Sequence, residues 1–189
     1  MIKVFEPLQK LLREIYKGPF IVDKLISQAE VIVLNNVKYV RKRYAKEVGI
    51  MKWLPPALFL KPIYPFTLEP RERLKREVEF FTNSWRYFRV PKILRFDEKE
   101  LEIIREFIDG NIISYKSRDD TQKLARLLAE IHYNNYALGD VKPSNFLISN
   151  NEIYVIDAEQ AIKSESLDPK SWDLLATFLI SSYFYLTNI

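Results

Sequence analysis

The sequence predicts an α+β protein in which a small antiparallel sheet precedes a mainly helical part. Short segments that alternate between apolar and polar residues, separated by polar turns, occur at 20–44 and 90–105. Longer segments with apolar residues three and four positions apart occur at 70–83 and 120–134. A last apolar segment at 174–186 is too short to span a bilayer, so we expect it to form a buried helix.

Length and composition suit one domain or two small lobes. The chain has 189 residues, and its 48% hydrophobic content is enough to fill a core. With no cysteine and one histidine, disulfides, thiolate zinc sites and histidine-based metal clusters are excluded. Any metal should therefore have oxygen ligands, which suits Mg²⁺ or Mn²⁺. The N-terminus lacks a signal-peptide pattern, so we expect a cytoplasmic protein without a membrane span.

The N-terminal part is predicted to contain a leading helix and three strands. Apolar residues at helical spacing within 1–19 are followed by a Gly-Pro pair that ends the helix. The segments 20–26, 30–35 and 37–44 read as strands separated by polar turns. An Asn-Asn pair between the last two strands is the clearest hairpin signal, so the strands are expected to form an antiparallel sheet.

A lysine in the third strand is expected to need a partner. Alternation places Lys42 on the face shared by Val40 and Tyr44, and burial of an unpaired ammonium is costly. The helix expected at 70–83 carries Glu77 beside its apolar stripe. Glu77 is therefore the predicted partner. The alternative is that either residue is an ordinary solvated surface group.

Two further strands and a core helix are predicted next. The strands are expected at 90–94 and 101–105, around a turn at 97–100. The helix at 120–134 has its apolar residues on one face, which predicts a buried position. His132 lies at its end, where a structural role in helix capping is expected.

The residues that carry chemistry follow this helix. Asp140, Lys142 and Asn145 lie within six residues, and Asp157 comes twelve residues after Asn145. Between them, 146–156 reads as two short strands and a polar turn, which brings Asn145 and Asp157 to the same end of a hairpin. Two carboxylates, an amide and a lysine in one small volume can hold a metal nucleotide beside a hydroxyl nucleophile.

This arrangement resembles the catalytic loop and metal-binding aspartate of the protein-kinase-like superfamily. In that family the loop reads His-Arg-Asp-x-Lys-x-x-Asn or His-Gly-Asp-x-x-x-x-Asn, and a second aspartate opens an Asp-Phe-Gly triplet. Here the segments are Leu-Gly-Asp at 138–140 and Asp-Ala-Glu at 157–159. The resemblance implies a two-lobed protein-kinase-like fold, with an antiparallel N-lobe sheet over 20–108 and a reduced, mainly helical C-lobe over 109–189.

The resemblance assigns roles in phosphoryl transfer to the catalytic-loop residues. Asp140 would orient the hydroxyl nucleophile and accept its proton, and Lys142 would offset charge on the moving phosphoryl group. Asn145 and Asp157 would hold Mg²⁺ or Mn²⁺. Asp173 resembles the helix aspartate that braces the kinase catalytic loop; a simple helix-start carboxylate is the alternative.

It also assigns residues to ATP. Lys42 and Glu77 resemble the strand lysine and helix glutamate that hold the nucleotide phosphates. Glu106 and Ile108 would mark the hinge, whose backbone holds adenine. Arg105 would stand at the back of the adenine pocket, where a charged residue is unusual.

Several positions depart from the kinase pattern. No glycine occurs between Gly18 and Gly49, so the turn expected at 27–30 lacks the glycines that normally cover the phosphates. Ala158 and Glu159 replace Phe-Gly after the metal aspartate. Only fifteen residues separate Asp157 from Asp173, too few for a regulated activation loop.

These departures resemble the small atypical branch of the superfamily, which includes the kinase subunit of the KEOPS tRNA-modification complex, RIO kinases and lipopolysaccharide-kinase-like proteins. The resemblance implies a minimal serine/threonine protein kinase that modifies itself or acts within a complex on a protein substrate. Ser164, Ser166 and Ser171 are the nearest candidates for self-modification. A small-molecule or sugar kinase is an alternative.

A second hypothesis comes from charge. Residues 38–76 contain eleven Lys or Arg against three Asp or Glu, whereas the whole chain has a net charge of +4. Such a patch can bind tRNA or an acidic partner surface, although a solvated face is the simpler explanation. Without catalysis, the chain would be a kinase-like pseudoenzyme or binding module.

Overall fold

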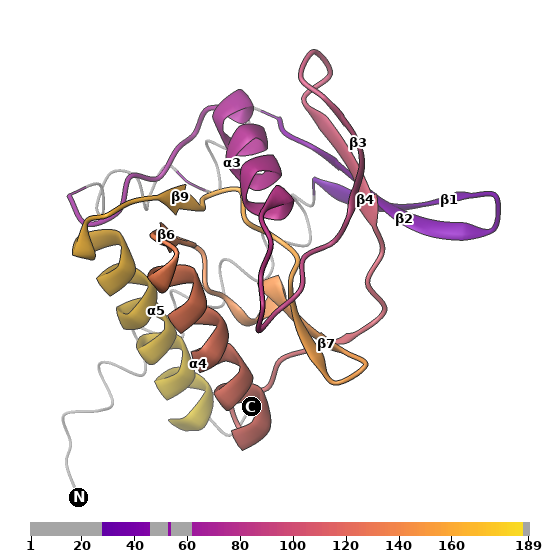
Figure 1. Cartoon of the computed structure of the whole chain (residues 1–189). Coiled ribbons are helices and arrows are strands. Elements are labelled where there is room, and N and C mark those ends of the chain that lie inside the picture. Colours follow the sequence, from indigo (N-terminus) through magenta and orange to yellow (C-terminus); the bar gives the residue numbers. More distant parts are fainter. Residues whose placement is uncertain (1–27, 46–52, 54–61, 187–189) are drawn as a thin grey trace, which may run out of the picture.

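A computed structural model of the protein describes residues 28–45, 53 and 62–186 (Figure 1). The predicted leading helix and the strand at 20–26 lie outside these residues. The described helices and strands are β1 (Ala29–Leu34), β2 (Val37–Arg43), α3 (Pro70–Thr82), β3 (Ile93–Asp97), β4 (Glu102–Glu106), β5 (Asn111–Ile112), α4 (Arg118–Tyr133), β6 (Tyr136–Ala137), the 3₁₀ turn η1 (Pro143–Asn145), β7 (Phe146–Ser149), β8 (Glu152–Val155), β9 (Ile162–Lys163) and α5 (Leu167–Leu186). The predicted α+β class is confirmed.

The N-terminal sheet is antiparallel throughout, in the order β1-β2-β4-β3. Asn35 and Asn36 join β1 to β2 with φ angles of 50° and 63°, which asparagine tolerates and a tight hairpin turn requires. β3 extends three residues beyond the predicted end, because Asp97, expected in the turn, still pairs with Glu102.

The turn expected at 27–30 is wrong for its described residues. Ala29 and Glu30 belong to β1 and pair with Lys42 and Arg41. The backbone amide of Arg43 also donates to the Gln28 carbonyl at 2.9 Å. Residues 28–30 therefore lie alongside β2 instead of turning away from it.

Helix α3 covers one face of this sheet (Figure 1). Pro70 starts the helix at a position where no amide hydrogen is needed. Leu74 of α3 packs with Tyr44 and Ile103 of the sheet, and all three are nearly fully buried. This contact fixes the position of α3 over the sheet and so places Glu77 next to Lys42 of β2.

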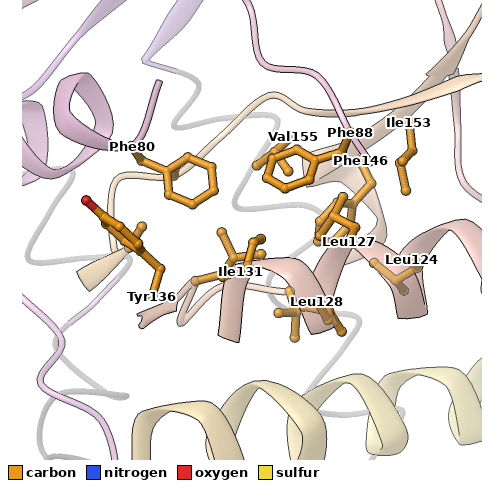
Figure 2. Packing of buried hydrophobic residues seen from close by; sticks show 14 of the residues in the cluster. Phe80, Phe88, Leu124, Leu127, Leu128, Ile131, Tyr136, Phe146, Ile153 and Val155 are labelled. Atoms are coloured by element: carbon orange, nitrogen blue, oxygen red, sulfur yellow. The ribbon is translucent and has the colours of Figure 1, made fainter. Parts of the chain in front are cut away.

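The other end of the molecule is built on α4 and α5, which lie side by side in Figure 1. The predicted apolar face of α4 is confirmed, and Figure 2 shows Leu127 and Ile131 facing Phe80, Phe88 and Phe146. This cluster also takes in the β7–β8 hairpin, so the hairpin that carries the site rests on the main core.

The last helix begins earlier than predicted. It runs from Leu167, because Pro169 falls in the first turn, where its missing amide hydrogen costs nothing. Ser171 therefore lies on α5 instead of in a connecting segment, and Asp173 lies in the second turn. Among the described residues, no helix combines the length and apolar character that crossing a membrane requires.

The core predicts the effect of one substitution. Leu127 is 0% exposed, so Leu127→Ala should lower the free energy of unfolding by about 2–5 kcal/mol, through lost burial and the cavity left behind. Leu174→Ala on α5, where the side chain is 56% exposed, should change it by no more than about 0.5 kcal/mol. Urea unfolding of both variants measures the difference, and equal effects would contradict this core.

Candidate active site

The β7–β8 hairpin positions Asn145 and Asp157 as predicted. Phe146 pairs with Val155, so the residues on either side of this pair meet at the same end of the hairpin. The Ile156 amide donates to the Asn145 carbonyl at 2.9 Å. Asp157 thus emerges directly beside the catalytic loop.

Asn145 also holds the loop that carries Asp140. Its side-chain amide nitrogen donates to the Asp140 carbonyl at 2.9 Å, and its backbone amide donates to the Lys142 carbonyl at 3.0 Å. The Lys142 ammonium lies 3.5 Å from Asp140 Oδ2, and both side chains are partly exposed. The two predicted catalytic side chains therefore lie next to each other, each with part of its surface exposed.

Asp173 braces this loop from behind, as the resemblance implied. Its fully buried carboxylate accepts hydrogen bonds from the Leu138 amide at 2.7 Å and the Gly139 amide at 2.8 Å. A His132 ring nitrogen lies 3.1 Å from the same carboxylate. The His132 side chain thus supports Asp173, which is a structural role as expected, although its ring contacts α5 and does not cap its own helix.

Gly139 is required where the braced loop turns. Its φ of +75° is unfavourable for other residues, and an added Cβ would lie 2.5 Å from the ring of Tyr64. The Tyr64 hydroxyl donates to the Gln160 carbonyl at 2.6 Å and lies 3.1 Å from the Ala137 carbonyl. The segment before α3 is therefore packed directly onto the catalytic loop.

Lys42 connects the sheet, α3 and the hairpin. Its ammonium donates to Glu77 at 2.5 Å and to Asp157 at 3.0 Å. Burial lowers the pKa of Lys42, but three surrounding carboxylates more than offset this, so its pKa lies above the ordinary value and the ammonium stays charged. Burial raises the pKa of Glu77, against the opposing effect of the Lys42 charge. The predicted partnership is present, and Asp157 shares it.

A third carboxylate completes the surroundings of Lys42. Glu159 Oε2 lies 3.4 Å from the Lys42 ammonium, and its side chain is 1% exposed. Trp53 Nε1 donates to Glu159 at 2.8 Å, and Arg73 Nη1 donates to it at 3.3 Å. Arg73 is itself fully buried. These charges form a buried network around the lysine.

The predicted hinge lies at the end of β4. The Glu106 amide donates to the Lys92 carbonyl at 2.9 Å, and the Glu106 carboxylate accepts from the Lys92 amide at 3.2 Å. Ile108 follows in the partly buried connection from β4 to β5. This segment connects β4 of the N-terminal sheet to β5, which pairs with the catalytic hairpin.

Arg105, the unusual residue before the hinge, is buried at 5% exposure. Its guanidinium donates to the Ile156 carbonyl at 2.9 Å and lies over the Phe81 ring. The side chain therefore connects β4 to the residue before Asp157.

Oxygen ligands for a hard cation are available at the end of the hairpin. The amide nitrogen of Asn145 is committed to Asp140, and Asp157 retains 20% side-chain exposure. Oxygens of Glu77, Asp157 and Glu159 also lie within 4.8 Å of one another, but the Lys42 ammonium contacts all three. The donor set at Asn145 and Asp157 suits Mg²⁺ or Mn²⁺ better than the cluster around the lysine.

Known proteins with similar sequences support the resemblance to protein kinases. No protein-family model matches the chain. A protein of Archaeoglobus fulgidus named as a probable serine/threonine-protein kinase BUD32 homolog is 29% identical over 152 residues, which cover 80% of this chain and 71% of that protein. The chain is related to atypical protein-kinase-like proteins. It is a kinase-like protein, and its sheet and small helical part fit the kinase-like fold.

Other relatives are much longer. Proteins of Methanosarcina acetivorans and Methanocorpusculum labreanum, each named as a probable bifunctional tRNA threonylcarbamoyladenosine biosynthesis protein, are 28% and 29% identical over 109 and 90 residues. These matches cover 57% and 47% of this chain but 20% and 17% of the bifunctional proteins. The chain thus matches about a fifth of their length.

Sequence reasoning missed two residues of this candidate site. Glu159 was seen only as a replacement for glycine, and Arg73 was counted in the basic region at 38–76. Lys42 and Arg73 are buried, so neither adds to a surface patch. A signal for Arg73 was available, because it lies one helical turn before Glu77 and so shares its face of α3.

The brace at Asp173 predicts a second effect. Asp173→Asn leaves an amide group opposite two backbone donors, and should lower the free energy of unfolding by about 1–3 kcal/mol. Asp168→Asn, an exposed change in the first turn of the same helix, is the matched control and should stay within about 0.5 kcal/mol. Chemical denaturation measures both, and an equal, small effect would show that Asp173 does not brace the loop.

Proposed function

We propose that the chain is an ATP-dependent phosphotransferase, a minimal atypical serine/threonine protein kinase. The main support is the contact of Lys42 with both Glu77 and Asp157. Lys42 lies on β2, Glu77 on α3 and Asp157 just after the β7–β8 hairpin. Asp157 in turn lies beside the loop of Asp140 and Asn145. Four separate parts of the chain thus converge on groups suited to phosphoryl transfer.

Residues from two lobes, at 20–108 and 109–189, would bind ATP and the divalent cation. Lys42, held in place by Glu77, would bind the outer phosphates of ATP with its permanent positive charge. The backbone of the hinge at Glu106 and Ile108 would bind adenine. Asn145 and Asp157 would hold the divalent cation, which when bound neutralises charge on the phosphates.

Asp140 and Lys142 would act at the acceptor. The Asp140 carboxylate would orient a hydroxyl group toward the terminal phosphorus. The hydroxyl oxygen forms a bond to that phosphorus as the bond to the bridging oxygen of ADP breaks, and the hydroxyl proton passes to Asp140. Lys142, 3.5 Å from Asp140, would offset the charge on the phosphoryl group.

The name of the Archaeoglobus fulgidus relative favours a protein hydroxyl over a sugar as the acceptor. Ser164 and Ser166 lie between β9 and α5, and Ser171 is exposed on α5. These serines are candidate acceptors on the chain itself.

A second candidate function is a role beside a partner in tRNA modification. The names of the bifunctional relatives support it, because each joins a segment like this chain to a longer tRNA-modification protein. Lys38, Arg71 and Lys75 remain exposed in the basic region and would contribute to a tRNA or protein contact. This role is compatible with either catalysis or binding alone.

The catalytic proposal predicts loss of phosphoryl transfer in two variants. Purified protein with radiolabelled ATP and Mg²⁺ should label itself or a generic protein substrate. Asp140→Asn and Asp157→Asn should each reduce the rate about 100-fold or more, because one removes the proton acceptor and the other a metal ligand. Asp168→Asn, on the exposed start of α5, should label as the unchanged protein does. Full labelling in the two site variants would refute the assignment.

Nucleotide binding separates the kinase from a pseudoenzyme. ATP with Mg²⁺ should raise the melting temperature of the unchanged protein, and Lys42→Met should abolish the increase. An increase without turnover, alone or with a partner protein, would favour the binding module. If neither an increase in melting temperature nor turnover is seen, a scaffold is favoured.

A further inference from the structure

Glu159 stands two residues after Asp157, where the kinase pattern has glycine, yet its side chain points into the site. Its carboxylate accepts from Trp53 and Arg73 and lies 3.4 Å from the Lys42 ammonium. Its backbone amide donates to Asp157 Oδ1 at 3.2 Å. One residue thus contacts both the proposed phosphate-binding lysine and the proposed metal ligand.

Arg73 ties the same carboxylate to the N-terminal part of the molecule. Its guanidinium donates to Glu159 at 3.3 Å, to the Ala45 carbonyl at 2.6 Å and to the Gln28 side chain at 3.3 Å. Arg73 precedes Glu77 by four residues, so both project from one face of α3. The helix that orients Lys42 is therefore bonded directly to the segment that carries Asp157.

The next residue strengthens this connection. The Gln160 side chain makes two hydrogen bonds with the backbone of Thr67, each at 2.9 Å, and is fully buried. The Gln160 carbonyl accepts from Tyr64 at 2.6 Å. Residues 159 and 160 are thus bonded to α3 and to the segment leading into it.

We propose that Arg73 and Glu159 are positioning residues that lock α3 and Asp157 in the arrangement needed for phosphoryl transfer. The proposal rests on the proposed function and explains what keeps the proposed phosphoryl-transfer site in its arrangement. Any movement of α3 away from the hairpin would leave a buried charge without its partner, which is costly. The short segment between Asp157 and Asp173 offers little room for a separate activation loop. The buried pair of Arg73 and Glu159 instead connects α3 to the segment that carries Asp157.

A double variant separates positioning from simple stabilisation. Glu159→Gln leaves the buried Arg73 charge without its carboxylate, and Arg73→Met takes one of two cations, Arg73 and Lys42, away from the buried Glu159 carboxylate. Each change should lower the melting temperature by on the order of 10 °C. The double variant removes both charges at similar volume and should recover most of that loss. Its kcat/KM for ATP, measured well below its melting temperature, should nevertheless stay about 10- to 100-fold low, because the Arg73–Glu159 contact no longer fixes α3 against the segment that carries Asp157.

The matched control is the half-exposed pair of Arg89 and Glu152, joined at 2.8 Å at the far end of the hairpin. Arg89→Met with Glu152→Gln should leave kcat/KM unchanged. Recovery of full kcat/KM in the Arg73→Met and Glu159→Gln double variant would overturn the proposal.

A readout independent of catalysis tests the same lock. Hydrogen exchange at the backbone amides of 77–81 and 157–160 should accelerate about tenfold or more in the double variant relative to amides of α4. Unchanged relative exchange would also overturn the lock. If the unchanged protein transfers no phosphate at all, the proposed function fails, and the exchange result still decides whether Arg73 and Glu159 hold these segments together.

Discussion

The structure depends on one buried ammonium. Lys42 is nearly inaccessible to solvent, so its charge is tolerable only because carboxylates from α3 and from the segment after β8 reach it. Two of them, Glu77 and Asp157, lie 35 and 115 residues away from the lysine along the chain. The requirement to pair this charge therefore ties the N-terminal sheet, the helix and the catalytic hairpin together. Charge pairs of this kind add little net stability over an apolar core, but loss of one partner leaves a buried charge uncompensated.

Much of the fold follows from local sequence patterns. The Asn-Asn pairs at 35–36 and 150–151 both adopt positive φ angles and turn their hairpins, as their composition predicts. The periodicity of 120–134 correctly predicted α4, and alternation in β2 correctly predicted the inward face of Lys42. The pairing of β7 with β8 placed Asn145 beside Asp157, which spacing alone had indicated.

Other features depend on contacts that no local pattern encodes. The two-residue strands β5, β6 and β9 exist only because distant segments pair with them, so they were not predicted. Arg73 was counted in a basic surface region and no position was predicted for Glu159, but both are buried and pair with each other. Where a charged side chain ends up thus depends on a partner 86 residues away, which composition and periodicity cannot specify.

The most direct test of the account is a crystal structure with Mn²⁺ and a non-hydrolysable ATP analogue. The account predicts manganese bound between Asn145 and Asp157, with the triphosphate against Lys42 and the base at the hinge near Glu106. Nucleotide bound elsewhere on the molecule, or manganese that displaces the Lys42 ammonium from its carboxylates, would contradict it.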